Sequence, residues 1–114
     1  MLEIKEREVN GVIVLDLKGK ITIGEGDRQL REKITSLLEQ GKKKIILNMA
    51  RVSYLDSSGT GEVVSLLMKV KKAGGELKLL SLSQKIKDIF QIAQLLSIFD
   101  YYTNEDEAVK AFSE

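Results

Sequence analysis

Residues 45–82 read IILNMARVSYLDSSGTGEVVSLLMKVKKAGGELKLLSL, and this stretch decides the predicted fold. It opens on an apolar run, residues 45–50, that lacks the alternation of a half-exposed strand and therefore predicts a central strand covered on both faces. A helical pattern follows and ends at Gly74-Gly75, and a second strand is predicted over residues 76–82. The apolar positions of that helix are Val63, Val64, Leu67, Met68 and Val70. A strand, a helix and a strand in this order favour two parallel neighbouring strands joined by a right-handed crossover.

Towards the amino end, the sequence predicts an antiparallel strand pair. Apolar and charged residues alternate in part over residues 2–8, Asn10-Gly11 is a strong hairpin signal, and residues 12–17 form an apolar run. Residues 18–27 contain three glycines and no steady period, so we expect a loop there, with Asp27 capping the next helix. The apolar positions of this helix are Leu30, Ile34, Leu37 and Leu38, and Gly41 ends it.

Towards the carboxyl end, two more helices and a short strand are predicted. Ser83 can cap a helix, residues 98–102 form a short strand, and Asn104 or Thr103 starts a final helix. The inward positions of these two helices are Ile86, Ile89, Phe90, Ile92 and Ala93, then Ala108, Val109 and Phe112; Met49 and Met68 are also expected in the core. The chain has 114 residues, near the usual size of one domain. We therefore expect a single α/β domain over residues 1–114, with a mixed β-sheet, an N-terminal hairpin and three to four α-helices.

Composition excludes several kinds of function. The chain carries 18 basic and 17 acidic side chains, so its net charge of +1 does not draw it as a whole onto nucleic acid or an anionic membrane. Cysteine and histidine are absent, which removes thiolate nucleophiles, the imidazole base of serine catalysis and the commonest metal ligands. No apolar stretch approaches the roughly 18 to 20 residues of a membrane span. We expect a cytoplasmic protein that uses no metal or cofactor.

Small side chains gather between the central strand and its helix. Residues 57–61 read Ser-Ser-Gly-Thr-Gly, and a helix beginning near Ser58 offers free amides that favour an anion. Two glycines in the first helical turn each cost roughly 0.8 to 1 kcal/mol against alanine, so something other than helix stability favours them. The simpler interpretation is an N-cap at Asp56 or Ser57 followed by a tight turn. A nucleotide-binding P-loop lacks its required spacing, and a serine nucleophile would lack its histidine base.

The residues Val52-Ser53-Tyr54-Leu55-Asp56-Ser57-Ser58-Gly59-Thr60-Gly61 resemble the signature loop of bacterial anti-sigma factor antagonists, the STAS domain family. The likeness extends over nearly the whole chain, from the opening hairpin to the Phe90 to Phe99 region. It implies that Ser57, directly after the aspartate, is phosphorylated by an anti-sigma factor that is also an ATP-dependent serine kinase. It also implies that Asp56 positions or activates the Ser57 hydroxyl, and that the kinase contact is lined by Ser58, Gly59, Thr60 and Gly61.

The resemblance further implies a partner-switching cycle without catalysis by this chain. The unphosphorylated antagonist binds the anti-sigma factor and frees a sigma factor, phosphorylation abolishes that binding, and a serine phosphatase resets the cycle. A second loop of the family faces the same partner and corresponds here to Thr22, Ile23 and Gly24. Many relatives carry an acidic residue where this chain has Thr22, so the identity of the partner stays open.

Two other functions stay open at this stage. One is a STAS module that binds constitutively within a transporter or signalling assembly, with Ser57 never modified. The other is a small nucleotide-binding domain that uses the same helix terminus. The lysine-rich stretches 42–44 and 69–72 are expected to be solvated surface rather than a nucleic-acid site, because few aromatic residues accompany them. The sequence is compatible with a monomer or a weak dimer.

Overall fold

The strand β3 (Lys44–Leu55) lies at the centre of a five-stranded sheet with the order β1-β2-β3-β4-β5. This computed structural model describes residues 2–113. The other strands are β1 (Glu3–Val9), β2 (Val12–Ile21), β4 (Glu76–Leu80) and β5 (Tyr101–Tyr102). The β1 and β2 strands are antiparallel, whereas β2, β3, β4 and β5 pair in parallel with their neighbours. The predicted α/β class, mixed sheet, N-terminal hairpin and central strand are therefore confirmed.

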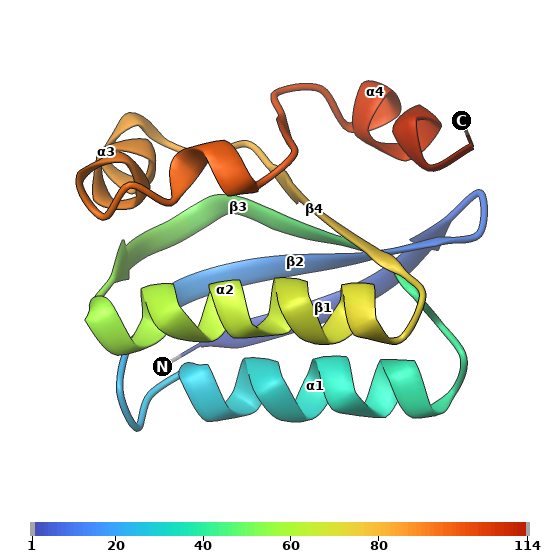
Figure 1. The fold of residues 1–114 in the computed structure, drawn as a ribbon, viewed down its shortest axis with the longest axis horizontal. Coiled ribbons are helices and arrows are strands. Elements are labelled where there is room, and N and C mark those ends of the chain that lie inside the picture. The colour runs from blue at the N-terminus through green and yellow to red at the C-terminus, as the bar shows by residue number, and fades with distance from the viewer. Residues whose placement is uncertain (1, 114) are drawn as a thin grey trace.

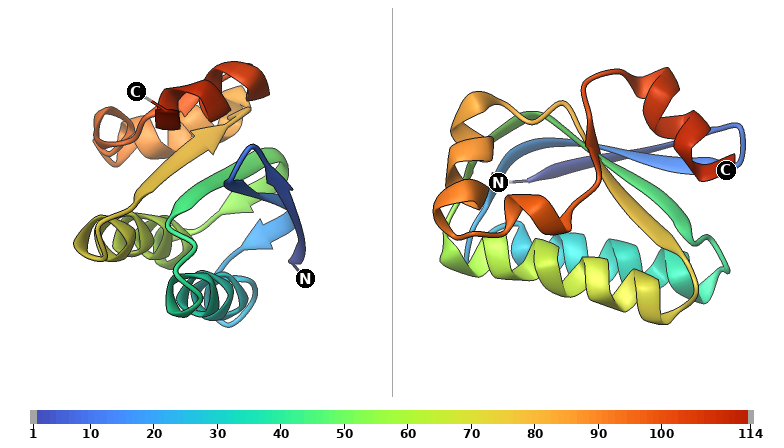
Figure 2. Two further views of the ribbon diagram at one scale, coloured as in Figure 1. Left: turned by 90° about the vertical axis from the view of Figure 1, so that its right-hand side faces the viewer. Right: turned by 45° about the horizontal axis from the view of Figure 1, so that its top comes forward.

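Four α-helices cover the two faces of the sheet. They are α1 (Asp27–Glu39), α2 (Ser57–Lys72), α3 (Gln84–Ile92) and α4 (Glu105–Lys110), with 3-10 turns at Leu96–Ile98 and Ala111–Ser113. Figure 1 shows α1 and α2 side by side below the sheet and α3 and α4 above it, and the turned views of Figure 2 agree. No helix in the described part of the chain has the length and apolar character that crossing a membrane requires.

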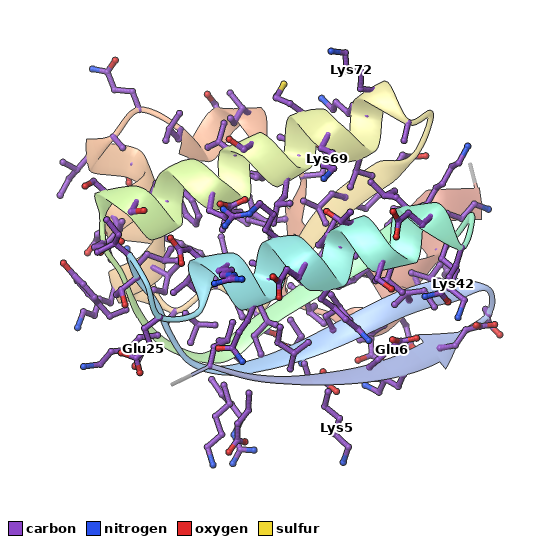
Figure 3. All side chains as sticks on the ribbon, turned by 90° about the horizontal axis from the view of Figure 1, so that it is seen from below. Lys5, Glu6, Glu25, Lys42, Lys69 and Lys72 are labelled. Carbon is purple, nitrogen blue, oxygen red and sulfur yellow. The ribbon has the colours of Figure 1, made fainter. Side chains whose placement is uncertain are left out.

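The alternation of side chains along the strands builds two apolar layers. The larger layer joins the inward faces of β2, β3 and β4 to α1 and α2, and α3 adds Ile86 and Phe90 to it. The smaller layer joins Val14 and Ile46 to α4. Figure 3 shows the alternation on β1, where Glu6 points towards α1 and Lys5 points away from it. The Glu6 carboxylate lies 2.5 Å from the Lys33 ammonium, which ties the edge strand to α1.

An ionic cluster attaches the short helix α4 to the upper face of the sheet. The Arg7 guanidinium on β1 donates to the Asp16 carboxylate at 2.7 Å and to the Glu105 carboxylate at 2.9 Å. The Asn48 side-chain amide donates to Asp16 at 2.7 Å. Beside this cluster, the Lys78 ammonium is buried over the ring of Phe112, at 5.1 Å from its centroid. Charged groups and apolar packing together therefore hold α4 against the sheet.

The β2 strand is longer than the sequence indicates. Residues 18–27 were expected to be a loop, but β2 runs to Ile21 and pairs with β3 along that length. The pairing register shifts next to Lys18 and again between Gly19 and Lys20, so the strand lacks the regular alternation by which a sequence reveals one. The expected cap is also displaced by one residue. Gly26, with a φ of 96°, is the N-cap of α1, and Asp27 is its first helical residue.

Three residues expected in the core are exposed, and one predicted strand is shorter than expected. Met68 is 48% exposed on α2, Ile92 is 83% exposed on α3, and Ala93, directly after α3, is exposed as well. Each follows the apolar period of its helix, but the neighbouring elements leave it open to solvent. The predicted strand over residues 98–102 pairs only at Tyr101–Tyr102, because residues 96–98 form a 3-10 turn. The caps at Ser83 and Asn104 and the termination at Gly41 are as predicted.

Candidate functional site

Three segments meet at the carboxyl end of the parallel strands, at the left of Figure 1. They are the turn between β2 and α1, the junction between β3 and α2, and the helix α3 with the residues that follow it. The predicted site residues come from the first two segments, so the fold brings them together. The topology explains this, because parallel strands place their following loops at one edge of the sheet.

Asp56 is the N-cap of α2 and organises the junction. Its Oδ1 accepts a hydrogen bond from the Gly59 amide at 2.7 Å, and its main-chain carbonyl accepts from both the amide and the hydroxyl of Thr60 at 2.9 Å. The bond from Gly59 satisfies a donor that the first turn of a helix leaves unpaired, and the bond from the Thr60 amide is the first regular bond of the helix. The expected N-cap at this position is confirmed, and it fixes the helix to begin at Ser57.

The second carboxylate oxygen of Asp56 reaches across to the turn after β2. Its Oδ2 accepts a hydrogen bond from the Ile23 amide at 3.0 Å. The bonds from Ile23 and then Gly59 lower the pKa of the Asp56 carboxyl below its ordinary value. A carboxylate of low pKa is a weak proton acceptor, so Asp56 is poorly suited to remove a proton from the Ser57 hydroxyl. Its geometry suits positioning instead.

The two adjacent serines have different environments. Ser57 is exposed as the first residue of α2. Ser58 is partly buried, and its hydroxyl donates to the Asp27 carboxylate at 3.3 Å. Ser57 is therefore at the surface, whereas Ser58 is bonded within the fold. Sequence reasoning missed the role of Asp27. It was expected to cap α1, but its carboxylate accepts a hydrogen bond from Ser58 on α2.

The two glycines of the first turn also differ. Gly59 is buried, and a Cβ there would overlap the carbonyl oxygen of Ile21 at the end of β2. The close approach that Gly59 permits is thus to the chain's own backbone rather than to a partner. Gly61 is exposed, and a Cβ there would meet nothing within 4 Å. Of the two, only Gly61 keeps a contact surface open beside Ser57.

A groove of about 400 Å³ runs beside Ser57, between the start of α2 and α3. Its lining is mostly apolar, and Ile92 projects at its rim with 83% of its surface exposed. Tyr54 is 40% exposed on the same groove, with the Lys85 ammonium 5.3 Å from its ring centroid. The lining residues are Tyr54, Leu55, Asp56, Ser57, Thr60, Gly61, Ile89, Ile92, Ala93 and Leu95. An exposed apolar groove of this kind is typical of a protein-binding surface.

The same geometry argues against nucleotide binding at the helix terminus. The Gly59 amide, which could otherwise hold a phosphate, already donates to the Asp56 carboxylate. The Asp56 carboxylate would also repel a phosphate approaching that terminus. Sequence reasoning missed the groove, because it ended the central strand at residue 50 and took Ile92 for a core residue. In the structure β3 runs on to Leu55, so Tyr54 lies near the end of this strand. The exposure of Tyr54 and Ile92 follows from tertiary packing alone.

Comparisons with known proteins agree with this fold. The family profile of the STAS domain matches residues 3–108. The anti-sigma-B factor antagonist of Bacillus subtilis is 35% identical over 109 residues, which cover 96% of each chain. The Bacillus cell fate determinant SpoIIAA, solved in its phosphorylated form, is 29% identical with a TM-score of 0.71 and covers 96% of this chain and 98% of its own.

One further comparison concerns the fold alone. A crystal structure of a candidate anti-sigma factor antagonist from Thermotoga maritima superimposes with a TM-score of 0.89, at 23% identity, over 97% of this chain and 95% of its own. From the matched residues and the identity to the Bacillus subtilis antagonist, the chain belongs to the STAS domain family, alongside the anti-sigma factor antagonists.

Proposed function

We propose that the protein is an anti-sigma factor antagonist that works by partner switching and is controlled by phosphorylation of Ser57. In its unphosphorylated form it binds an anti-sigma factor that is also a serine kinase, and so frees a sigma factor in the cytoplasm. Phosphorylation ends the binding, and a serine phosphatase restores it. The role is regulatory, and the chain serves as ligand and substrate rather than as a catalyst.

The exposure of Ser57 at the start of α2 carries the proposal. Ser57 directly follows the capping Asp56, and its neighbour Ser58 is bonded to Asp27. The relatives add support, because one is an antagonist of an anti-sigma factor and another exists in a phosphorylated form. Ser57 is exposed as the first residue of α2, so a phosphate on its hydroxyl displaces no buried side chain and leaves the fold intact.

The effect of the phosphate on binding follows from its surroundings. It adds about 1.5 to 2 negative charges next to Asp56 and beside the apolar groove. A partner fitted to the neutral surface would have to bury these charges without matching groups, which costs several kcal/mol. A loss of about 3 to 4 kcal/mol corresponds to a roughly 10² to 10³ weaker complex. Local charge and bulk are thus sufficient for the switch.

Phosphopeptide mapping after incubation with ATP and the cognate kinase tests the proposal. We expect phosphate on Ser57 in the native chain and in Ser58→Ala, and none in Ser57→Ala. Phosphate found solely on Ser58 or Thr60 would overturn the assignment. A tight complex without any phosphate transfer would instead favour a constitutive binding module.

A further inference from the structure

The Asp56 carboxylate joins two segments that are far apart in the sequence. Its two oxygens accept from the amides of Gly59, on α2, and Ile23, in the turn after β2, at 2.7 Å and 3.0 Å. Hydrogen bonds to a charged acceptor are about twice as strong as those between neutral groups. A longer bond of 3.3 Å between Ser58 and Asp27 links the same two regions. The two hydrogen bonds to Asp56 are therefore the shorter connections between α2 and the segment after β2.

The turn that Asp56 holds is closed by its own main chain. The amides of Thr22 and Glu25 each donate to the carbonyl of the other, at 2.7 Å and 3.0 Å. The Thr22 hydroxyl also donates to the Glu25 carbonyl at 3.2 Å. Gly26 is buried against the Lys20 carbonyl, with no room for a Cβ. The turn is therefore held in shape by its own bonds, and its position relative to α2 depends on how it is attached to that helix.

The same turn displays an apolar side chain beside the proposed phosphorylation site. Ile23 is 75% exposed, although its amide is bonded to the residue that precedes Ser57. Asp56 thus bonds to the main chain of Ile23 and also lines the groove beside Ser57. A partner that covers Ser57 meets Ile23 at a distance that Asp56 sets.

We propose that Asp56 is a positioning residue: by accepting from the Ile23 amide it holds Ile23, which lies in the loop that the family resemblance assigns to the partner, in fixed register with Ser57 for docking of the anti-sigma factor kinase. We call the hydrogen bond from the Ile23 amide to the Asp56 carboxylate the strut. This inference rests on the proposed function for the identity of the partner, but the strut itself does not depend on that function. Asp56 acts through Ile23 and does not remove the proton of the Ser57 hydroxyl. Its contribution is to binding.

A measurement without any partner tests the strut. In Asp56→Asn one oxygen still caps α2, but the amide nitrogen cannot accept from Ile23. By nuclear magnetic resonance we expect hydrogen exchange of the Ile23 amide to become about tenfold faster, with that of Gly59 changed less than about twofold. Unchanged exchange at Ile23 would overturn the strut and would leave the proposed function untouched.

A double-mutant cycle with the kinase tests the docking role. We expect Ile23→Ala to weaken binding about tenfold in the native chain but less than about twofold in Asp56→Asn, because an unheld Ile23 is already misplaced. The control Met68→Ala removes another exposed apolar side chain, three helical turns from Ser57, and should leave affinity unchanged. Additive losses would show that Asp56 and Ile23 act independently and would overturn the docking role.

Kinetics of phosphorylation separate positioning from proton removal. Loss of the strut should raise KM about tenfold and leave kcat within about twofold. A large fall in kcat at unchanged KM would assign Asp56 to the chemical step and would overturn the proposal. Absence of phosphorylation in the native chain would refute the proposed function, and the exchange result at Ile23 would still decide the strut.

Discussion

Gly59 lies directly against the carbonyl oxygen of Ile21, so the first turn of α2 seats on the end of β2 only because residue 59 has no side chain. A Cβ would overlap main-chain atoms that cannot rotate away. Of the small residues beside Ser57, Gly59 therefore serves packing within the fold rather than an open surface. Gly61, two residues on, faces open space.

The two glycines should respond oppositely to alanine. Gly59→Ala should lower the free energy of unfolding by roughly 1 to 3 kcal/mol through overpacking against β2. Gly61→Ala should leave it unchanged or raise it by up to about 1 kcal/mol through better helix propensity. Urea unfolding of both variants beside the native chain measures the difference. Equal stabilities would show that α2 shifts to accommodate the Cβ.

Charge at Ser57 should control binding. Ser57→Asp should bind the anti-sigma factor roughly 10² to 10³ more weakly, since it places a second carboxylate beside Asp56. Ser57→Ala should bind well and resist inactivation by ATP. Titration calorimetry with the purified partner gives both affinities. Native affinity in Ser57→Asp would mean that the size of the phosphate, rather than its charge, is what prevents binding of the partner.

Phosphorylation should change the structure only near the site. We expect amide shift differences at residues 56–61 and, because Asp56 bonds to Ile23, also at residues 22–26. The helices α1 and α4 should keep their spectra. Comparison of assigned spectra of the two forms decides this, and shifts spread through the sheet would contradict a local switch.

The cluster that attaches α4 should make stability fall in acid. The bond from Arg7 is the main cause that lowers the pKa of both Asp16 and Glu105 from their ordinary values of 3.8 and 4.5. Unfolded carboxyls therefore take up protons before folded ones as the pH falls. The stabilising contribution is complete above the ordinary values and is lost as the pH drops through the lowered ones.

Replacing Arg7 provides the check on this acid dependence. In Arg7→Met the carboxyls should titrate nearer their ordinary values, so the fall in unfolding free energy below pH 4.5 should become shallower. Thermal unfolding of both chains across the acid range measures the slope. Lys18→Met, on the exposed part of β2, serves as a charge-matched control. Identical slopes in Arg7→Met and the native chain would assign the acid sensitivity elsewhere.

Lys78 should contribute mainly through its aliphatic stem. Its side chain is 5% exposed, whereas its partners Glu76 and Asp100 are 51% and 69% exposed and stay solvated without it. Lys78→Met keeps the packing over Phe112 and should change the unfolding free energy by less than about 1 kcal/mol. Lys78→Ala removes that packing and should cost about 2 kcal/mol more. Equal losses in the two variants would show that the charge matters more than the stem.

Local signals in the sequence predicted most of the architecture. The hairpin at Asn10-Gly11, the cap at Ser83 and the apolar run of β3 each express a preference of a few neighbouring residues. The bond between Ser58 and Asp27 and the exposure of Ile92 could not be predicted, because they depend on which elements lie side by side. The prediction of Ser57 as the phosphorylation site rests on resemblance, whereas the hydrogen bond between Ile23 and Asp56 depends on the folded arrangement of two distant segments.

The order of the strands in the sheet is the order in which they are synthesised, β1 to β5. Each strand after β1 therefore pairs with the strand that precedes it in the chain, and none is inserted between two neighbours that are already paired. At the other edge, β5 has only two residues and so presents little unpaired main chain to another strand. The sheet can thus be built by adding one strand at a time to the same edge, without opening a pair already formed.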